Sequence, residues 1–209
     1  MEQRVSTDGS KWYWPIYDTK CWEDLHAWHD VPDIIMQHVD TKNVIVQAGG
    51  NCGLYVKKYA QQFNRVYTFE PVNELFKCLV LNVPEDNVIK FQACLGDTHS
   101  LVSMNEHETK NIGGYHVGSN SGFIPTIKID DLNLDDCSLI HLDIEGYELF
   151  ALKGAICTIN KYKPIIVIEH CEKWLNRYCT SIKDIDEFLS SLKYEYTCSA
   201  RGDRIYKFC

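Results

Sequence analysis

Hydrophobic runs of strand length recur along the chain, and stretches with helical spacing separate them. The runs lie at residues 44–46, 65–69, 88–93, 138–144 and 164–169. Helical spacing of apolar residues predicts helices at 54–63, 73–82, 149–159 and 182–192. Strands that alternate with helices predict an α/β sandwich with a mostly parallel sheet.

Two further patterns depart from this alternation. Residues 194–199 and 204–208 flank the turn Arg201-Gly202-Asp203, which predicts a C-terminal antiparallel hairpin. Residues 123–129 alternate as an extra, inserted strand, whereas 99–122 are polar and glycine-rich and predict a loop. The hairpin disfavours a nicotinamide dehydrogenase, which usually continues with a second set of parallel strands.

The first 42 residues differ from the rest in composition, because four of the five tryptophans lie there. Residues 23–39 are loosely helical, with Pro32 as a start or kink. We expect 1–42 to be an aromatic-rich cover segment on a main unit at 43–209, within a single globular domain. Trp12, Trp14 and Tyr17 have two interpretations: they pack in the core, or their flat rings stack on an acceptor such as a sugar. His116 in the polar loop is a weaker candidate for acceptor binding.

Composition narrows the functional classes. The 209 residues carry a formal charge of −8, which disfavours nucleic acid as a partner. No apolar stretch is long enough to span a bilayer, and the first residues lack a basic region followed by an apolar one. Ten cysteines are scattered without a C-x-x-C pair or a zinc spacing, as expected for reduced thiols. We therefore expect a soluble, cytoplasmic protein without membrane insertion.

The strongest candidate for a cofactor site follows the first strand, where the sequence is Gln-Ala-Gly-Gly-Asn-Cys-Gly over residues 47–53. Gly49 and Gly53 allow positive φ or close ligand approach, and Asn51 tolerates left-handed geometry. About 20 residues further on, Glu70-Pro71 ends the second strand, where a carboxylate accepts hydrogen bonds from ribose hydroxyls in βαβ cofactor folds.

Acidic residues gather at the ends of the next two core strands. Alternation places His141, Asp143 and Glu145 on one side, and Glu169-His170 end the following strand. These five are the candidate catalytic residues, with Asp143 first as general base. Asp143 and Glu169 offer, as an alternative, oxygen ligands for a divalent ion such as Mg²⁺.

Four motifs in order resemble the FkbM family of methyltransferases: QAGGNCG at 47–53, FEP at 69–71, TIKIDDL at 126–132 and LIHLDIEGYE at 139–148. The resemblance implies a Rossmann-like class I methyltransferase fold with a seven-stranded sheet, S-adenosylmethionine (SAM) as the methyl donor, and O-methylation of a sugar or glycan. It is compatible with one part of a larger glycan-synthesis protein. The expected donor contacts are Gln47, Gly49, Asn51, Gly53, Glu70, Pro71, Cys94, Leu95, Asp97 and Asp143.

Three positions depart from the family pattern. The family usually has an acid at Gln47, Ala at Gly50 and Lys at His141. Gln47 still forms hydrogen bonds but offers no carboxylate to the cationic end of the donor. An alternative to an active O-methyltransferase is therefore a donor-binding module that is catalytically weak or inactive.

Overall fold

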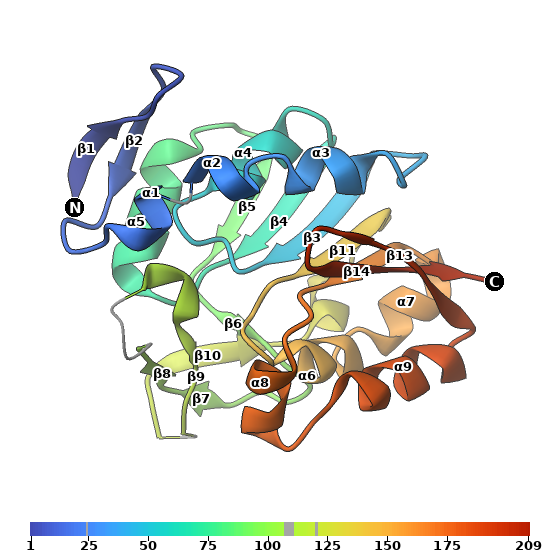
Figure 1. Ribbon diagram of the computed structural model, residues 1–209. Coiled ribbons are helices and arrows are strands. Elements are labelled where there is room, and N and C mark those ends of the chain that lie inside the picture. Colours follow the sequence, from blue (N-terminus) through green and yellow to red (C-terminus); the bar gives the residue numbers. More distant parts are fainter. Residues whose placement is uncertain (24, 107–110, 120) are drawn as a thin grey trace.

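The computed structural model describes residues 1–23, 25–106, 111–119 and 121–209, and a seven-stranded sheet forms its centre. Five strands are parallel: β3 (Val44–Ala48), β4 (Arg65–Phe69), β5 (Val88–Phe91), β11 (Leu139–Leu142) and β12 (Ile165–Ile168). The hairpin of β13 (Tyr194–Ala200) and β14 (Asp203–Phe208) joins antiparallel to β12. The order β13-β14-β12-β11-β3-β4-β5 confirms the predicted sheet and its C-terminal hairpin (Figure 1).

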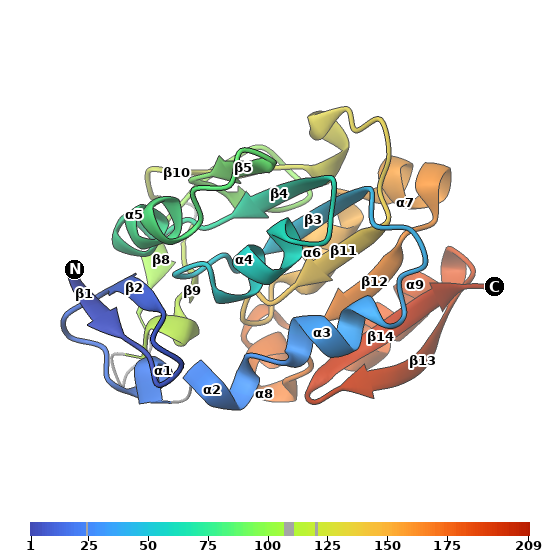
Figure 2. The same cartoon turned by 90° about the horizontal axis from the view of Figure 1, so that it is seen from above.

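Helices cover both faces of this sheet (Figure 2). One face packs against α3 (Val31–Met36), α4 (Leu54–Ala60) and α5 (Asn73–Asn82). The other packs against α6 (Glu148–Lys153), α7 (Ile156–Tyr162) and α9 (Ile182–Ser191). Successive strand residues point to opposite faces, so Leu139 joins the first core and Ile140 the second. Both faces are buried, which explains why the central strands are mostly apolar.

The single helix predicted at 149–159 is wrong, because the chain forms α6 and α7 with a break at Gly154 and Ala155. A Cβ atom at Gly154 would lie 2.0 Å from the carbonyl oxygen of Gly96, so a close backbone approach fixes the break. Asp130 then caps α7, since its carboxylate accepts hydrogen bonds from the Cys157 and Thr158 amides at 3.0 and 2.8 Å.

The predicted inserted β segment is present, in the form of a second small sheet. The third core strand ends at Phe91 instead of residue 93, and β6 (Cys94–Leu95) pairs with β10 (Ile124–Ile127). β7 (Leu101–Val102) pairs with the other side of β10. A short ladder of β8 (Met104–Asn105) and β9 (His116–Val117) occupies part of the predicted loop, followed by the 3-10 turn η2 (Ile129–Leu132) after β10.

The N-terminal segment adds a hairpin, and the helical stretch predicted at 23–39 is divided, with Pro32 at the start of its last helix. A hairpin of β1 (Glu2–Val5) and β2 (Lys11–Trp14), which the sequence pattern did not predict, lies beside α5 (Figure 1). The side chain of Asn82 in α5 bonds both the amide and the carbonyl of Tyr13. Three short helices follow, α1 (Lys20–Glu23), α2 (Leu25–Trp28) and α3, and Pro32 lies in the first turn of α3.

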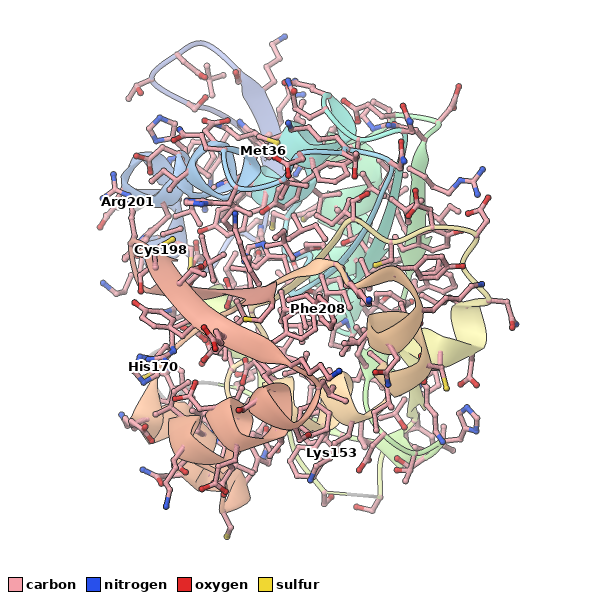
Figure 3. All side chains as sticks on the ribbon, turned by 90° about the vertical axis from the view of Figure 1, so that its right-hand side faces the viewer. Met36, Lys153, His170, Cys198, Arg201 and Phe208 are labelled. Atoms are coloured by element: carbon pink, nitrogen blue, oxygen red, sulfur yellow. The ribbon has the colours of Figure 1, made fainter. Side chains whose placement is uncertain are left out.

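The C-terminal hairpin is tied to this segment. Arg201 lies at the turn between β13 and β14 (Figure 3). It forms a two-pronged ion pair with Asp30, which precedes α3, at 2.7 and 2.8 Å. Between β12 and α9 the chain forms α8 (Glu172–Leu175) and the 3-10 turn η3 (Asn176–Tyr178). Within the described ranges, no helix combines the length and the apolar character needed to cross a bilayer.

Candidate functional site

A cavity of about 490 Å³ lies where the parallel strands end. Gly49 follows β3, Glu70 follows β4, Asp143 follows β11 and Glu169 follows β12, and all four line this cavity. Ligands of open α/β sheets bind at this edge, beyond the carboxyl ends of the strands. The sequence therefore predicted the side of the sheet on which the cavity lies.

Close backbone packing shapes the glycine turn. Gly49 has φ of 85°, and a Cβ atom there would lie 1.9 Å from the carbonyl oxygen of Asp143. Gly53 has φ of 95° and immediately precedes α4, where a Cβ would lie 2.6 Å from Val83. Gly49 and Asn51 line the cavity, whereas Gly53 is not part of the lining and packs against Val83.

Glu70 is buried and tied to the turn through its carboxylate. One oxygen accepts a hydrogen bond from the Asn51 amide at 2.7 Å, and the other accepts from the Val72 amide at 2.8 Å. Burial raises the pKa of Glu70 to about 7, although these two hydrogen bonds act in the opposite direction and lower it. Each oxygen retains a lone pair that a ligand hydroxyl can use.

The second group in the cavity consists of Asp143, Glu145 and Glu169, and one carboxylate oxygen from each lies within 4.8 Å of the other two. Burial raises the pKa of Asp143 to about 6, with the charge of Asp203 adding to the effect. Burial, followed by repulsion from Asp143, raises the pKa of Glu145 to about 8 and that of Glu169 well above its usual range. Carboxyl groups with such values can accept or release a proton near neutral pH.

Glu148 has a local structural role beside this cluster. It is the first residue of α6, and its Oε1 atom accepts hydrogen bonds from the Ile144 and Gly146 amides at 3.1 and 3.2 Å. The carboxylate thus fixes the loop that carries Glu145.

The cavity lining does not include Gln47 or His141. The predictions that Gln47 contacts the donor and that His141 is catalytic are therefore not supported by their positions. The Gln47 amide donates to the carbonyls of Ala48 and Gly49 and accepts from Thr68, so hydrogen bonds to the protein occupy both its ends. His141 is fully buried under α4, where its ring nitrogens meet Tyr59 Oη at 2.8 Å and Asp203 Oδ2 at 3.2 Å. Alternation gave the correct face of the strand for His141, but helix α4 covers that face.

The remaining predicted donor contacts divide in the same way. Pro71, Cys94 and Leu95 line the cavity, whereas Asp97 does not. His170 lines it from the end of β12, and its Nε2 lies 3.8 Å from Glu172 (Figure 3).

Of the predicted acceptor-binding residues, only Trp14 lines the cavity. It is buried, and its indole nitrogen donates to Asp18 at 2.7 Å. Trp12 is buried in the same aromatic cluster, with the ammonium of Lys57 5.0 Å from its ring centre. Tyr17 is exposed and bonds Tyr115, and His116 contacts the carbonyl of Gly114. Core packing is therefore the observed arrangement of Trp12 and Trp14.

Several cavity residues were not predicted. Tyr55 stands in the first turn of α4, directly after the glycine turn, and Tyr147 belongs to the DIEGYE segment, so position next to a motif was the available signal. Asp203 arrives from the C-terminal hairpin, and Trp28 and Tyr115 from the segments that flank the cavity. Their distance along the chain gave no local signal.

Comparison with known proteins agrees with this geometry. The sequence profile of the family described as "Methyltransferase FkbM domain" matches residues 43–196. Hexuronic acid methyltransferase AglP of Haloferax volcanii is 24% identical over 177 residues, a match that covers 81% of this chain and 71% of that protein.

Solved structures share the fold. Methyltransferase FkbM from Methylobacillus flagellatus KT gives a TM-score of 0.53 at 18% identity, over 93% of this chain and 56% of that one. This chain thus spans little more than half the length of that structure. A TehB-like SAM-dependent methyltransferase from Corynebacterium glutamicum gives a TM-score of 0.54 at 13% identity, over 91% and 95% of the two chains.

The region that matches the family profile contains the glycine turn, Glu70 and the acidic residues after β11 and β12. It also covers well over half of the chain. The resemblance inferred from the motifs is thereby confirmed, and the chain belongs to the FkbM methyltransferase domain family.

Proposed function

We propose that this protein transfers a methyl group from SAM to a hydroxyl group of a sugar or glycan. One observation carries the proposal: Glu70, which bonds the glycine turn from the end of β4, and the carboxyl groups of Asp143 and Glu145 line the same cavity. A carboxylate suited to ribose hydroxyls and groups suited to receive a proton thus share one space.

In this proposal the donor occupies the side of the cavity formed by the glycine turn. Ribose hydroxyls donate to the lone pairs that Glu70 retains beside the Asn51 and Val72 amides. Cys94 and Leu95 supply an apolar wall for the adenine ring.

The reaction needs an oxygen nucleophile in line with the sulfonium methyl group. A C–O bond forms as the S–CH₃ bond breaks, S-adenosylhomocysteine leaves, and the hydroxyl proton passes to the carboxyl cluster, with Asp143 as the first candidate. Because the methyl group is already activated, positioning of the two reactants supplies most of the acceleration.

The sugar acceptor is supported by the name of the related AglP, a hexuronic acid methyltransferase. The cavity adds a physical reason, since Trp28 is 48% exposed and lines it together with Tyr115. Flat apolar rings with a polar edge suit the faces of a sugar ring.

Calorimetric titration with SAM and S-adenosylhomocysteine tests donor binding, and transfer of a labelled methyl group to a panel of glycosides tests the acceptor. We expect Asp143→Ala to abolish transfer while donor binding largely remains, and Glu70→Ala chiefly to weaken donor binding. The proposal is contradicted if the protein binds neither SAM nor S-adenosylhomocysteine. It is also contradicted if each variant loses methyl transfer and donor binding to the same extent.

Gln47 and His141 are the residues that favour the alternative of an inactive donor-binding module. Both residues lie outside the cavity lining, so neither departure from the family pattern removes a group from the reaction space. Turnover of the donor with any glycoside would exclude this alternative.

A further inference from the structure

The carboxyl cluster has a geometry that the proposed reaction alone does not require. One oxygen from each of Asp143, Glu145 and Glu169 lies within 4.8 Å of the other two. Oxygen ligands placed around one Mg²⁺, Mn²⁺ or Ca²⁺ ion are separated by similar distances, given metal–oxygen bonds of about 2.0–2.6 Å. We propose that these three carboxylates bind one divalent cation that prefers oxygen ligands.

Unsatisfied buried oxygen atoms point to a ligand at this place. The Oε2 atoms of Glu145 and Glu169 are buried and have no hydrogen-bond partner among the described residues, and Glu145 as a whole is only 9% exposed. Glu70, in the same cavity, differs because backbone amides bond both of its oxygens. A buried carboxylate without donors is unfavourable, so the difference between Glu70 and the cluster calls for a cation.

The surrounding protein does not neutralise the cluster. In the described part of the chain, no lysine or arginine lines the cavity. Arg177 approaches Glu145, but its Nη1 atom donates to the backbone carbonyl of that residue at 2.8 Å. No protein cation therefore competes with a metal ion for these three carboxyl groups within the cavity lining.

Adjacent parallel strands hold two of the three carboxylates in place, and a fixed loop holds the third. The Asp143 amide donates to Ala48 at 3.1 Å, and the Glu169 amide donates to Leu142 at 2.9 Å, so both residues continue the ladder of the central sheet. Glu145 is fixed by Arg177 at its carbonyl and by the loop that Glu148 holds. A site on rigid strand ends suits a metal ion, whose ligands must keep a set geometry.

The role of the cation rests on the proposed function. A cation at the cluster would lower the pKa of an acceptor hydroxyl bound to it. Each carboxylate has two oxygens, so one can hold the ion while the other receives the hydroxyl proton. Binding of the ion itself does not depend on that role.

Titration of the chelator-treated, full-length protein with Mn²⁺, with free Mn²⁺ followed by electron paramagnetic resonance, tests the site. We expect one saturable Mn²⁺ per chain, displaced by Mg²⁺. Glu145→Gln and Glu169→Gln should each weaken binding about ten-fold or more, since each removes a ligand charge while keeping the side-chain shape. Glu70→Gln is the matched control, an acid of the same cavity outside the cluster, and should keep the wild-type affinity for Mn²⁺.

The competing occupant of the cluster is the ammonium group of the donor. Addition of S-adenosylhomocysteine, which carries that ammonium, should leave Mn²⁺ binding intact. Loss of Mn²⁺ binding on this addition, wild-type affinity in both cluster variants, or no saturable binding to the wild-type protein would each overturn the proposal.

Donor binding is measured separately by calorimetry in the presence of chelator, so the two proposals can fail independently. The wild-type titration decides the question even where a variant does not fold, and circular dichroism checks each variant.

Discussion

Replacement of Gly49 by alanine tests how tightly the glycine turn is packed against the neighbouring strand end. The added Cβ atom would lie 1.9 Å from the carbonyl oxygen of Asp143, a backbone atom that cannot rotate away. Gly9 provides a matched control, because it has the same φ of 85° but nothing within 4 Å of its added Cβ. The two substitutions therefore share the backbone strain and differ in the steric overlap.

The expected magnitudes follow from these two contributions. A non-glycine residue in the left-handed region costs about 1–2 kcal/mol, which is the whole effect expected for Gly9→Ala. Overpacking adds about 1–3 kcal/mol, and a rigid backbone contact belongs at the upper end of that range. Gly49→Ala should thus lower the free energy of unfolding by about 3–5 kcal/mol.

Urea denaturation of the wild-type protein and both variants, followed by circular dichroism, measures these differences. Gly49→Ala should also weaken S-adenosylhomocysteine binding, because relief of the overlap moves Asp143 away from the turn. Equal destabilisation by the two substitutions would refute the inferred contact between Gly49 and Asp143.

Three further predictions concern buried polar groups. Because the folded pKa of Glu70 is raised from 4.5 to about 7, its contribution to stability is full below pH 4.5 and is lost as the pH rises through 7. Raising the pH from 5 to 8 should therefore lower the unfolding free energy of the wild-type protein by about 2.5 kcal/mol more than that of Glu70→Gln, as measured by urea denaturation. Parallel pH profiles of the two proteins would contradict this. His141→Leu leaves Tyr59 and Asp203 without their shared partner, so we expect the unfolding free energy to fall by about 2–5 kcal/mol in urea denaturation. Donor affinity, measured by calorimetry, should change little. Normal stability with a large loss of turnover would instead support a catalytic role for His141. Gln47→Glu turns a carboxylate oxygen toward two backbone carbonyls, so it should lower the unfolding free energy by about 3 kcal/mol at pH 8. The loss should be smaller at pH 5, where the acid can be protonated and donate a hydrogen bond. Unchanged stability at both pH values would argue against the two hydrogen bonds of Gln47.

The elements of the central sheet could be predicted because burial on both faces leaves a direct signal in the sequence. The strand Val44–Ala48 is apolar except at Gln47, and the helix at Asn73–Asn82 matched its predicted bounds. The break between α6 and α7 had no such signal. It depends on Asp130, more than twenty residues upstream, and on a backbone contact with Gly96.

The site residues likewise divide into those that a local sequence pattern predicts and those that depend on distant parts of the chain. Gly49, Glu70, Asp143 and Glu169 each follow a parallel strand, and topology alone brings such residues to one edge. Asp203 reaches that edge on an antiparallel hairpin, whose position depends on its register with β12. A local pattern specifies the face of a strand but not which helix covers it, which is why His141 was expected to reach the cavity and instead meets Tyr59.

Gln47 shows how the family pattern and the structure together explain the turn. Its amide nitrogen donates to the carbonyls of Ala48 and Gly49, a contact that a carboxylate oxygen at this place could not make. The amide therefore fixes the turn that an acid at the same place would leave with unbonded carbonyls. Carboxyl groups at other positions can bring negative charge to the donor instead, because the described lining of the cavity includes Glu70, Asp143, Glu145, Glu169 and Asp203. A cationic methyl donor thus meets an acidic cavity even though residue 47 is neutral, and the substitution changes how the turn is held more than the charge that the donor meets.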